Sequence, residues 1–146
     1  MTAESFFMLL TVIGGIGWLA LIALSPFWKN VDRFIIGIIV VLIAITYSYL
    51  NFGNIGEVGG PTAFLSFEGV LKVFANPFLV DAGWAHILAF DLMVGMWIKH
   101  NAAQCGIKYW IVILVLLISI SFAPLGLLIY LLIRWIKTKQ YFTDFV

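Results

Sequence analysis

Apolar residues gather in four long runs along the chain, and polar or charged residues separate them. The runs cover 5–24, 34–52, 82–98 and 109–133. A bilayer core of about 30 Å is crossed by roughly 20 apolar residues in a helix, within a tolerated range of about 17 to 25. The pattern therefore predicts four transmembrane helices. The run over 82–98 is short for a span, whereas the run over 109–133 is long enough to tilt.

Proline and interfacial residues help to place the ends of these runs. The first run ends in the sequence SPFWKN, where Pro26 resists continuation of the helix and Trp28 and Lys29 suit a membrane interface. The second run is entered from Asp32. Pro124 lies inside the last run, so we expect a kink in that helix.

A different pattern occupies the sizeable loop between the second and third runs. The loop opens with several glycines, which favour turns over helix. From 62 to 75 apolar residues recur at steps of three and four, which is one face of a helix, at Phe64, Phe67, Leu71 and Phe74. We expect Thr62 to cap this helix and Asn76 with Pro77 to end it. The helix is predicted to lie along the membrane interface, and a re-entrant lid over the bundle is the alternative.

Composition agrees with an integral membrane protein. Hydrophobic residues make up 64% of the 146 residues and charged residues only 10%, whereas a soluble domain has about half and a quarter. The prediction is an all-α integral membrane protein that forms a single domain over 1–146, a four-transmembrane-helix bundle with the interfacial helix between helices 2 and 3. The net charge of +1 gives no clustered basic face for nucleic acid. Cys105 is the only cysteine, which excludes an intrachain disulfide.

Membrane orientation is not decided by the charges. Four spans would place both termini on one side, and the eight lysines and arginines divide evenly between the two sides. The positive-inside rule compares these counts, so it returns a tie. The basic cluster from Arg134 to Lys139 favours cytoplasmic termini.

Two ionisable residues lie within the third predicted span. Such groups cost about 2.5–3.5 kcal/mol on insertion scales and usually face a bundle interior or a wet cavity. Asp91 lies near the middle of the span and is a candidate for chemistry or ligand binding; the alternative is a carboxyl that holds helices together by hydrogen bonds. His86 lies about one turn inside the end and could transfer a proton near neutral pH, unless it is a satisfied interfacial histidine.

Helical geometry separates these two residues. Five residues of helix place their side chains about 140° apart, so His86 and Asp91 cannot pair along one face. Trp84, Asp91 and Gly95 instead share a stripe, on which Gly95 would allow close approach of a helix or a ligand. In the second span, Tyr47, Tyr49 and Asn51 are interpreted as part of the interfacial aromatic belt.

Cofactors and metals are not expected. The chain has two histidines, so a haem pair would require a dimer and a metal site would be short of ligands. The six tryptophans and thirteen phenylalanines could line a slot for a long apolar molecule. The expected partners are thus membrane lipids and a hydrophobic ligand. The glycines at 14–17 also offer a face for a homodimer.

Three segments of the chain resemble a known family. The run at 76–98 reads NPFLVDAGWAHILAFDLMVGMWI, and it resembles the hallmark segment of the plant neoxanthin-synthase family, also called the abscisic-acid-deficient-four family. The segments SPFWK at 25–29 and FAPLGLLIYLLIR at 122–134 are similar to other landmarks of that family in the same order. The resemblance covers nearly the whole chain, and its specific part lies around Trp84, His86 and Asp91.

The resemblance implies carotenoid chemistry within a membrane. Plant members are associated with conversion of violaxanthin to neoxanthin, an isomerisation that opens an epoxide to an allene and demands no redox cofactor. On this basis Asp91 and His86 are the expected acid and base, in either order, and Trp84, Gly95 and Asn76 are expected to shape the substrate site. The substrate could also be another carotenoid, a retinoid or a different polyene lipid. With no chloroplast transit peptide, the expected location is a bacterial inner (cytoplasmic) membrane.

Two other functions remain open at this point. The protein could bind a pigment or lipid without catalysis, with Asp91 as a structural carboxyl between helices. It could also be a proton-coupled carrier, although four helices and one acidic residue within the membrane provide few groups for binding and moving protons.

Overall fold

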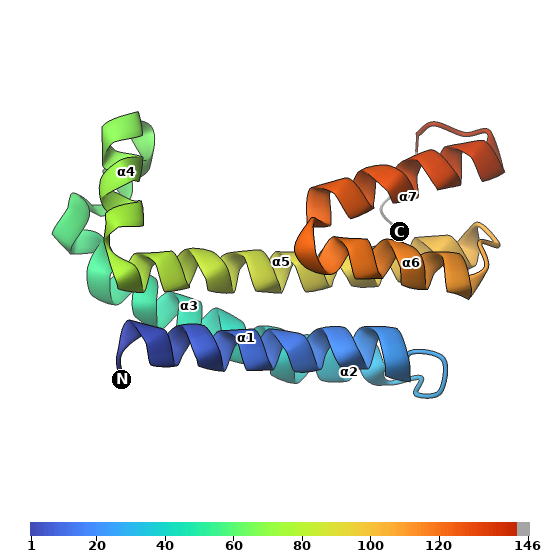
Figure 1. Ribbon diagram of the computed structural model, residues 1–146, viewed down its shortest axis with the longest axis horizontal. Helices are drawn as coiled ribbons and strands as arrows, with labels where there is room; N and C mark the ends of the chain where they lie inside the picture. Colours follow the sequence, from blue (N-terminus) through green and yellow to red (C-terminus); the bar gives the residue numbers. More distant parts are fainter. Residues whose placement is uncertain (143–146) are drawn as a thin grey trace. The chain divides into compact units, whose positions relative to one another are not determined.

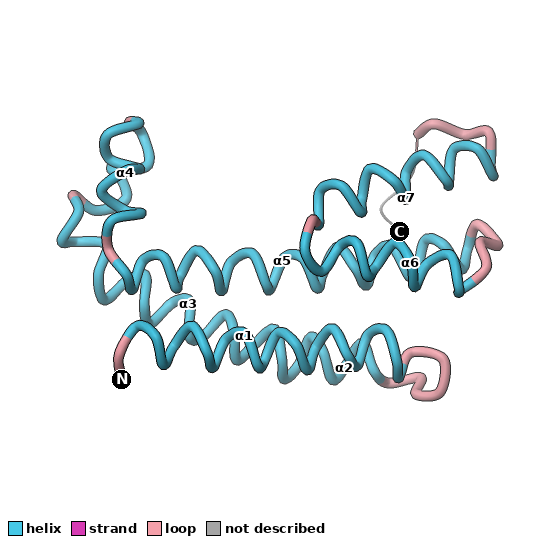
Figure 2. The backbone as a smooth tube through the Cα atoms, in the orientation of Figure 1, coloured by secondary structure: helices cyan, strands magenta, loops and turns pink. Residues whose placement is uncertain are grey.

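A computed structural model of the protein describes residues 1–142, in which helices predominate and no strand occurs (Figure 2). Three helical segments are long and apolar enough to cross a membrane: Ala3–Leu24, Val31–Val58 and Pro77–Gln104. They contain the predicted runs over 5–24, 34–52 and 82–98. The prediction of an all-helical protein with apolar membrane helices is therefore confirmed for these three segments.

The first two of these segments change their helical pitch along their length. The first joins α1 (Ala3–Leu19) to a π-helical turn, η1 (Ala20–Leu24). The second runs from α2 (Val31–Phe34) through the π-helical η2 (Ile35–Val40) and α3 (Val41–Asn54) into the 3₁₀ turn η3 (Ile55–Val58). The third segment is a single helix, α5 (Pro77–Gln104).

The chain divides into two compact units. Unit 1 contains Met1–Gly17 and Arg33–Ala89, and unit 2 contains Trp18–Asp32 and the chain from Phe90 onward. Helix α5 contributes residues to both units. The prediction of a single domain over 1–146 stays a prediction.

The fourth predicted span, 109–133, is not one helix. In unit 2 it is divided into α6 (Tyr109–Ser121) and α7 (Ala123–Thr138), because Phe122 leaves the helical region with φ −141° and ψ 65°. The second helix folds back along the first (Figure 1). At about 1.5 Å per residue, each of the two is shorter than a bilayer core of about 30 Å. The predicted count of four spans is thus not confirmed.

Pro124 starts a helix and does not kink one. It lies in the first turn of α7, where the missing backbone N–H has no partner to lose and the fixed φ suits a helix. Close packing then holds the two helices together, since a Cβ at Gly126 would fall 2.0 Å from the Ser119 hydroxyl oxygen. The chain therefore reverses direction at this point, where the sequence predicted a kink within one helix.

The loop between the second and third membrane helices forms part of unit 1. A turn at Gly59 and Gly60, with φ of 100° and 69°, leads into the 3₁₀ segment η4 (Gly60–Leu65) and then α4 (Phe67–Ala75). The predicted helix over 62–75 is thus shorter than expected. Its placement at the membrane interface stays a prediction.

Ser66, and not Thr62, caps α4. The Ser66 backbone is extended and its hydroxyl oxygen accepts a hydrogen bond from the Gly69 N–H at 3.1 Å. The Thr62 hydroxyl donates to the Gly59 carbonyl at 2.8 Å, so it belongs to the preceding turn. A Cβ at Gly69 would lie 2.2 Å from the Ala63 carbonyl oxygen, which shows how closely α4 packs on η4.

Unit 2 is held together by hydrogen bonds that side chains make at helix ends. The Tyr109 hydroxyl lies 3.3 Å and 3.0 Å from the carbonyl oxygens of Leu21 and Ile22, in the π-helical turn η1. The buried Tyr130 hydroxyl donates to Asn101 Oδ1 at 2.6 Å. These bonds give the Tyr109 and Tyr130 hydroxyl groups partners among apolar side chains.

Candidate functional site

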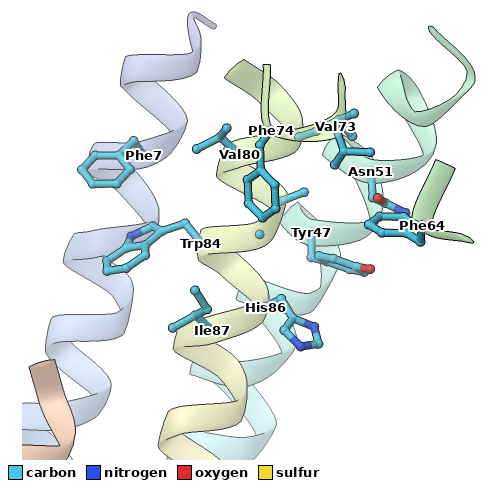
Figure 3. A pocket seen from close by; sticks show the side chains of 13 residues that line it. Phe7, Tyr47, Asn51, Phe64, Val73, Phe74, Val80, Trp84, His86 and Ile87 are labelled. Atoms are coloured by element: carbon cyan, nitrogen blue, oxygen red, sulfur yellow. The ribbon is translucent and has the colours of Figure 1, made fainter. Parts of the chain in front are cut away.

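Unit 1 contains a pocket of about 470 Å³ that opens between α1, α3, α4, η4 and α5 (Figure 3). Its volume lies in the range of small-molecule sites, about 300–1,000 Å³. The walls are mainly apolar, and five of the lining residues are aromatic: Phe7, Tyr47, Phe64, Phe74 and Trp84. Such walls suit a flat, conjugated, apolar ligand.

Polar side chains reach the pocket from two helices. His86 comes from α5, whereas Tyr47 and Asn51 come from α3. Tyr47 and Asn51 are four residues apart, which places them on one face of their helix. The Tyr47 and His86 rings lie with centroids 6.1 Å apart and planes inclined by 47°. The pocket thus combines an imidazole, a phenol and an amide with aromatic walls.

The Trp84 side chain is fixed between α1 and α5. Its indole Nε1 donates a hydrogen bond to the Thr11 hydroxyl oxygen at 3.0 Å. Its ring also stacks on Phe7, with centroids 5.5 Å apart and planes inclined by 27°. The same helices meet closely one turn away, because a Cβ at Gly14 would approach Leu88 to 2.9 Å. Trp84, expected to shape a substrate site, therefore forms a rigid wall of this pocket.

Asn76 caps the helix that carries His86 and does not line the pocket. Its Oδ1 accepts from the backbone N–H groups of Phe78 and Leu79, at 3.0 Å and 3.3 Å. Its Nδ2 donates to Glu57 Oε2 at 3.0 Å. These contacts explain why α5 begins at Pro77 and not at residue 82. Asn76 thus caps α5, and its expected part in shaping a substrate site stays a prediction.

Asp91 and Gly95 belong to unit 2. Asp91 is half-buried and is not among the residues that line the unit 1 pocket. A Cβ at Gly95 would lie 2.9 Å from Leu21 and 3.1 Å from Trp18, so helix packing uses the close approach expected there. The structure therefore brings together His86 and Trp84 from the predicted set, and places Asp91 and Gly95 elsewhere.

Three residues of interest were missed by the sequence analysis. Tyr47 and Asn51 were interpreted as interfacial, and their spacing of four residues was the available signal for a shared face. Asp81 was taken to precede the third span, yet it lies inside α5 and is only 3% exposed. If the third helix had been predicted to begin at Pro77, Asp81 would have been recognised as a carboxyl group within an apolar helix.

Clusters of side chains that could bind a metal ion do not occur in the part of the chain that the structure describes. Among residues 1–142, no three His, Cys, Asp or Glu side chains come together in a way that could hold a metal ion. The expectation that no cofactor is needed stays a prediction.

Comparison with known proteins gives one match. A family model described as ABA DEFICIENT 4-like matches residues 5–130, which include every residue that lines the pocket. Neither the curated proteins nor the solved structures give a match.

Proposed function

The chain belongs to the ABA DEFICIENT 4-like family, which is linked to carotenoid metabolism, and on this premise we propose that it isomerises a lipid-dissolved polyene in the unit 1 pocket. The match confirms the resemblance of the segment at 76–98. The observation that carries the proposal is the placement of His86 and Tyr47 in one aromatic pocket. Proton-transfer groups and apolar walls together suit acid–base chemistry on a polyene.

The proposed reaction opens an epoxide next to the conjugated chain to give an allene. An acid protonates the epoxide oxygen as its C–O bond breaks. A base removes a proton from the polyene, and the freed electron pair forms the second double bond of the allene. Substrate and product have the same atoms and the same oxidation level, so no redox partner is consumed.

His86 and Tyr47 can divide these two tasks. A neutral imidazole has a lone pair on one ring nitrogen that can accept a proton, so His86 is assigned as the base. The phenol has an O–H group that can donate a proton, so Tyr47 is assigned as the acid. A proton passed from the imidazolium back to the phenolate restores both groups. Asp91 is not among the residues that line the pocket, so this division of tasks assigns no step to it, and its expected catalytic role stays a prediction.

Asn51 and Trp84 are proposed to position the ligand. The Asn51 amide can donate to an oxygen of the ligand, and the fixed Trp84 ring supplies a face for stacking on conjugated carbon. A long polyene would place one end in the pocket. The proposed location is the bacterial inner membrane.

Non-catalytic binding of a pigment is the second candidate. The mostly apolar lining of the pocket favours it, since an apolar site can hold a polyene without changing it. In that case Asp91 would serve as a structural carboxyl in unit 2.

The test uses the only two histidines of the chain as a matched pair. The protein, His86→Gln and His100→Gln are each co-expressed with enzymes that make defined epoxy-carotenoids, and products and bound pigment are analysed. His100 lies outside the pocket and contacts Asp32 at 2.8 Å. We expect loss of product in His86→Gln with pigment still bound, and normal product in His100→Gln. Full activity of His86→Gln would exclude the acid–base role, and pigment binding without any product in the wild type would favour the second candidate.

A further inference from the structure

Asp81 is a buried carboxyl group that the proposed reaction does not use. It lies in the second turn of α5 and is 3% exposed. Its Oδ2 atom has no hydrogen-bond partner among the residues that the structure describes. Carboxylates are rarely buried in this way, because burial removes hydration and normally requires a partner in exchange.

A missing partner at such a position calls for an explanation. Leaving a buried acceptor unsatisfied destabilises the folded protein more than a typical hydrogen bond stabilises it. An apolar residue at this position would avoid that cost, and α5 is otherwise rich in such residues. Retention of a carboxyl group therefore points to a donor that arrives with a ligand.

Asp81 lines a second hollow of unit 1, of about 670 Å³, between α1, α4 and the start of α5. Phe7, Phe74 and Val80 line both this hollow and the pocket that contains His86. These three residues are shown together in Figure 3. The two hollows are thus neighbours with common walls, and one elongated ligand could contact both.

We propose that Asp81 binds a hydroxyl group on the ring of the polyene that occupies the adjoining pocket, and thereby selects hydroxylated over unhydroxylated polyenes. The inference rests on the proposed function for the identity of the ligand class. A hydroxyl group donates one hydrogen bond and adds no charge, so it can enter between aromatic walls. An ammonium group would have to lose its hydration there, which is much more costly.

Selectivity follows from the same unpaired carboxylate. A site built to pair with a hydroxyl group disfavours the analogue that lacks it, because the buried acceptor is then left unsatisfied. A hydrogen bond to a charged acceptor corresponds to a preference of roughly 10- to 100-fold.

The test measures binding and needs no turnover. Purified protein in detergent is titrated with zeaxanthin, which has a ring hydroxyl at each end, and with β-carotene, which has none, and tryptophan fluorescence quenching gives the two affinities. We expect the wild type to prefer zeaxanthin by roughly 10- to 100-fold and Asp81→Leu to lose that preference. Asp81→Asn retains an acceptor oxygen and should keep part of it.

Glu68→Gln is the matched control. Glu68 lines neither hollow, and its exposed carboxylate pairs with Lys72 at 3.0 Å, so it needs no partner from the ligand. This variant should bind both carotenoids as the wild type does. Phosphatidylglycerol, whose headgroup also carries hydroxyl groups, is added as a competitor and should not displace zeaxanthin.

The outcomes separate this inference from the proposed reaction. Equal affinity of the wild type for the two carotenoids, an unchanged preference in Asp81→Leu, or displacement of zeaxanthin by phosphatidylglycerol would each overturn the role of Asp81, and product formation would be unaffected by that result. A clear preference that depends on Asp81 would stand even if no carotenoid were ever isomerised. Circular dichroism of Asp81→Leu confirms that the variant is folded, and Asp81→Asn carries the test if it is not.

Discussion

His86 and Tyr47, which come from different helices of unit 1, present their rings to one pocket with centroids 6.1 Å apart. Between them they provide a ring nitrogen that can accept a proton and a hydroxyl group that can donate one. Aromatic side chains of Phe64, Phe74 and Trp84 line the same pocket. This pairing is the basis of the first prediction.

Tyr47→Phe removes the phenol oxygen and keeps the ring. We expect product formation to fall by roughly 10²- to 10⁴-fold, the usual contribution of a general acid or base, while bound pigment is unchanged. The control is Tyr49→Phe, because Tyr49 is 69% exposed and does not line the pocket, and its ring is tilted by 40° to that of Phe6. Equal activity of the two variants would remove Tyr47 from the reaction.

Trp84→Phe and Thr11→Val each remove one partner of the hydrogen bond that fixes the pocket wall. Each change should destabilise the protein by about 0.5–1.5 kcal/mol. The double variant should lose less unfolding free energy than the two single variants together, because all three variants lose the same hydrogen bond. Thermal unfolding in detergent measures these values, and strict additivity would contradict a direct bond between the two side chains.

Gly126→Ala tests the reversal between α6 and α7. A Cβ at this position would fall 2.0 Å from the Ser119 hydroxyl oxygen and 3.0 Å from its Cα, so the two helices would have to separate. We expect a loss of about 1–3 kcal/mol, typical of overpacking. Gly15→Ala is the control, because no atom lies within 4 Å of its Cβ position and alanine favours helix by about 0.5–1 kcal/mol. A stable Gly126→Ala variant would argue for the continuous helix that the sequence predicts.

Ser66→Ala tests which residue caps α4. Loss of the bond to the Gly69 N–H should destabilise the start of the helix by about 1 kcal/mol. Thr62→Ala, which removes only a bond within the preceding turn, should leave α4 unchanged. Hydrogen exchange of the amide groups of α4 distinguishes the two, and faster exchange in Thr62→Ala alone would restore the original prediction.

The hydrophobic pattern was sufficient to predict the three long helices, but it did not predict that the fourth run is divided into two helices. Residues 109–133 are apolar throughout, so the break at Phe122 leaves no trace in the hydrophobic pattern. Pro124 was the one local signal, and proline is compatible with either a kink or a helix start. Packing of Gly126 on Ser119 decides between them, and that contact is a property of the folded chain.

Sequence reasoning found His86 and Trp84 because polar and aromatic side chains stand out within an apolar run. It missed Tyr47 and Asn51, since a tyrosine near the end of a membrane helix is equally typical of an interface. The family resemblance named Asp91 and His86 as acid and base although helix geometry separates them, and this pairing stays a prediction, with His86 but not Asp91 lining the pocket. The polar side chains that share a pocket with His86, those of Tyr47 and Asn51, come from α3, and a single sequence does not reveal such neighbours.

Phe64 and Phe74 line the pocket and are also 55% and 64% exposed, so its wall belongs to the outer surface of unit 1. Under the proposed function, a pocket open at the surface would hold one end of a long polyene and leave the rest of the molecule outside, so it would not select for chain length. Polyenes with long or short tails should therefore compete on equal terms if their termini match. The two ends of a symmetrical carotenoid would then react in separate binding events. The product converted at one end should therefore be released and accumulate before the product converted at both ends.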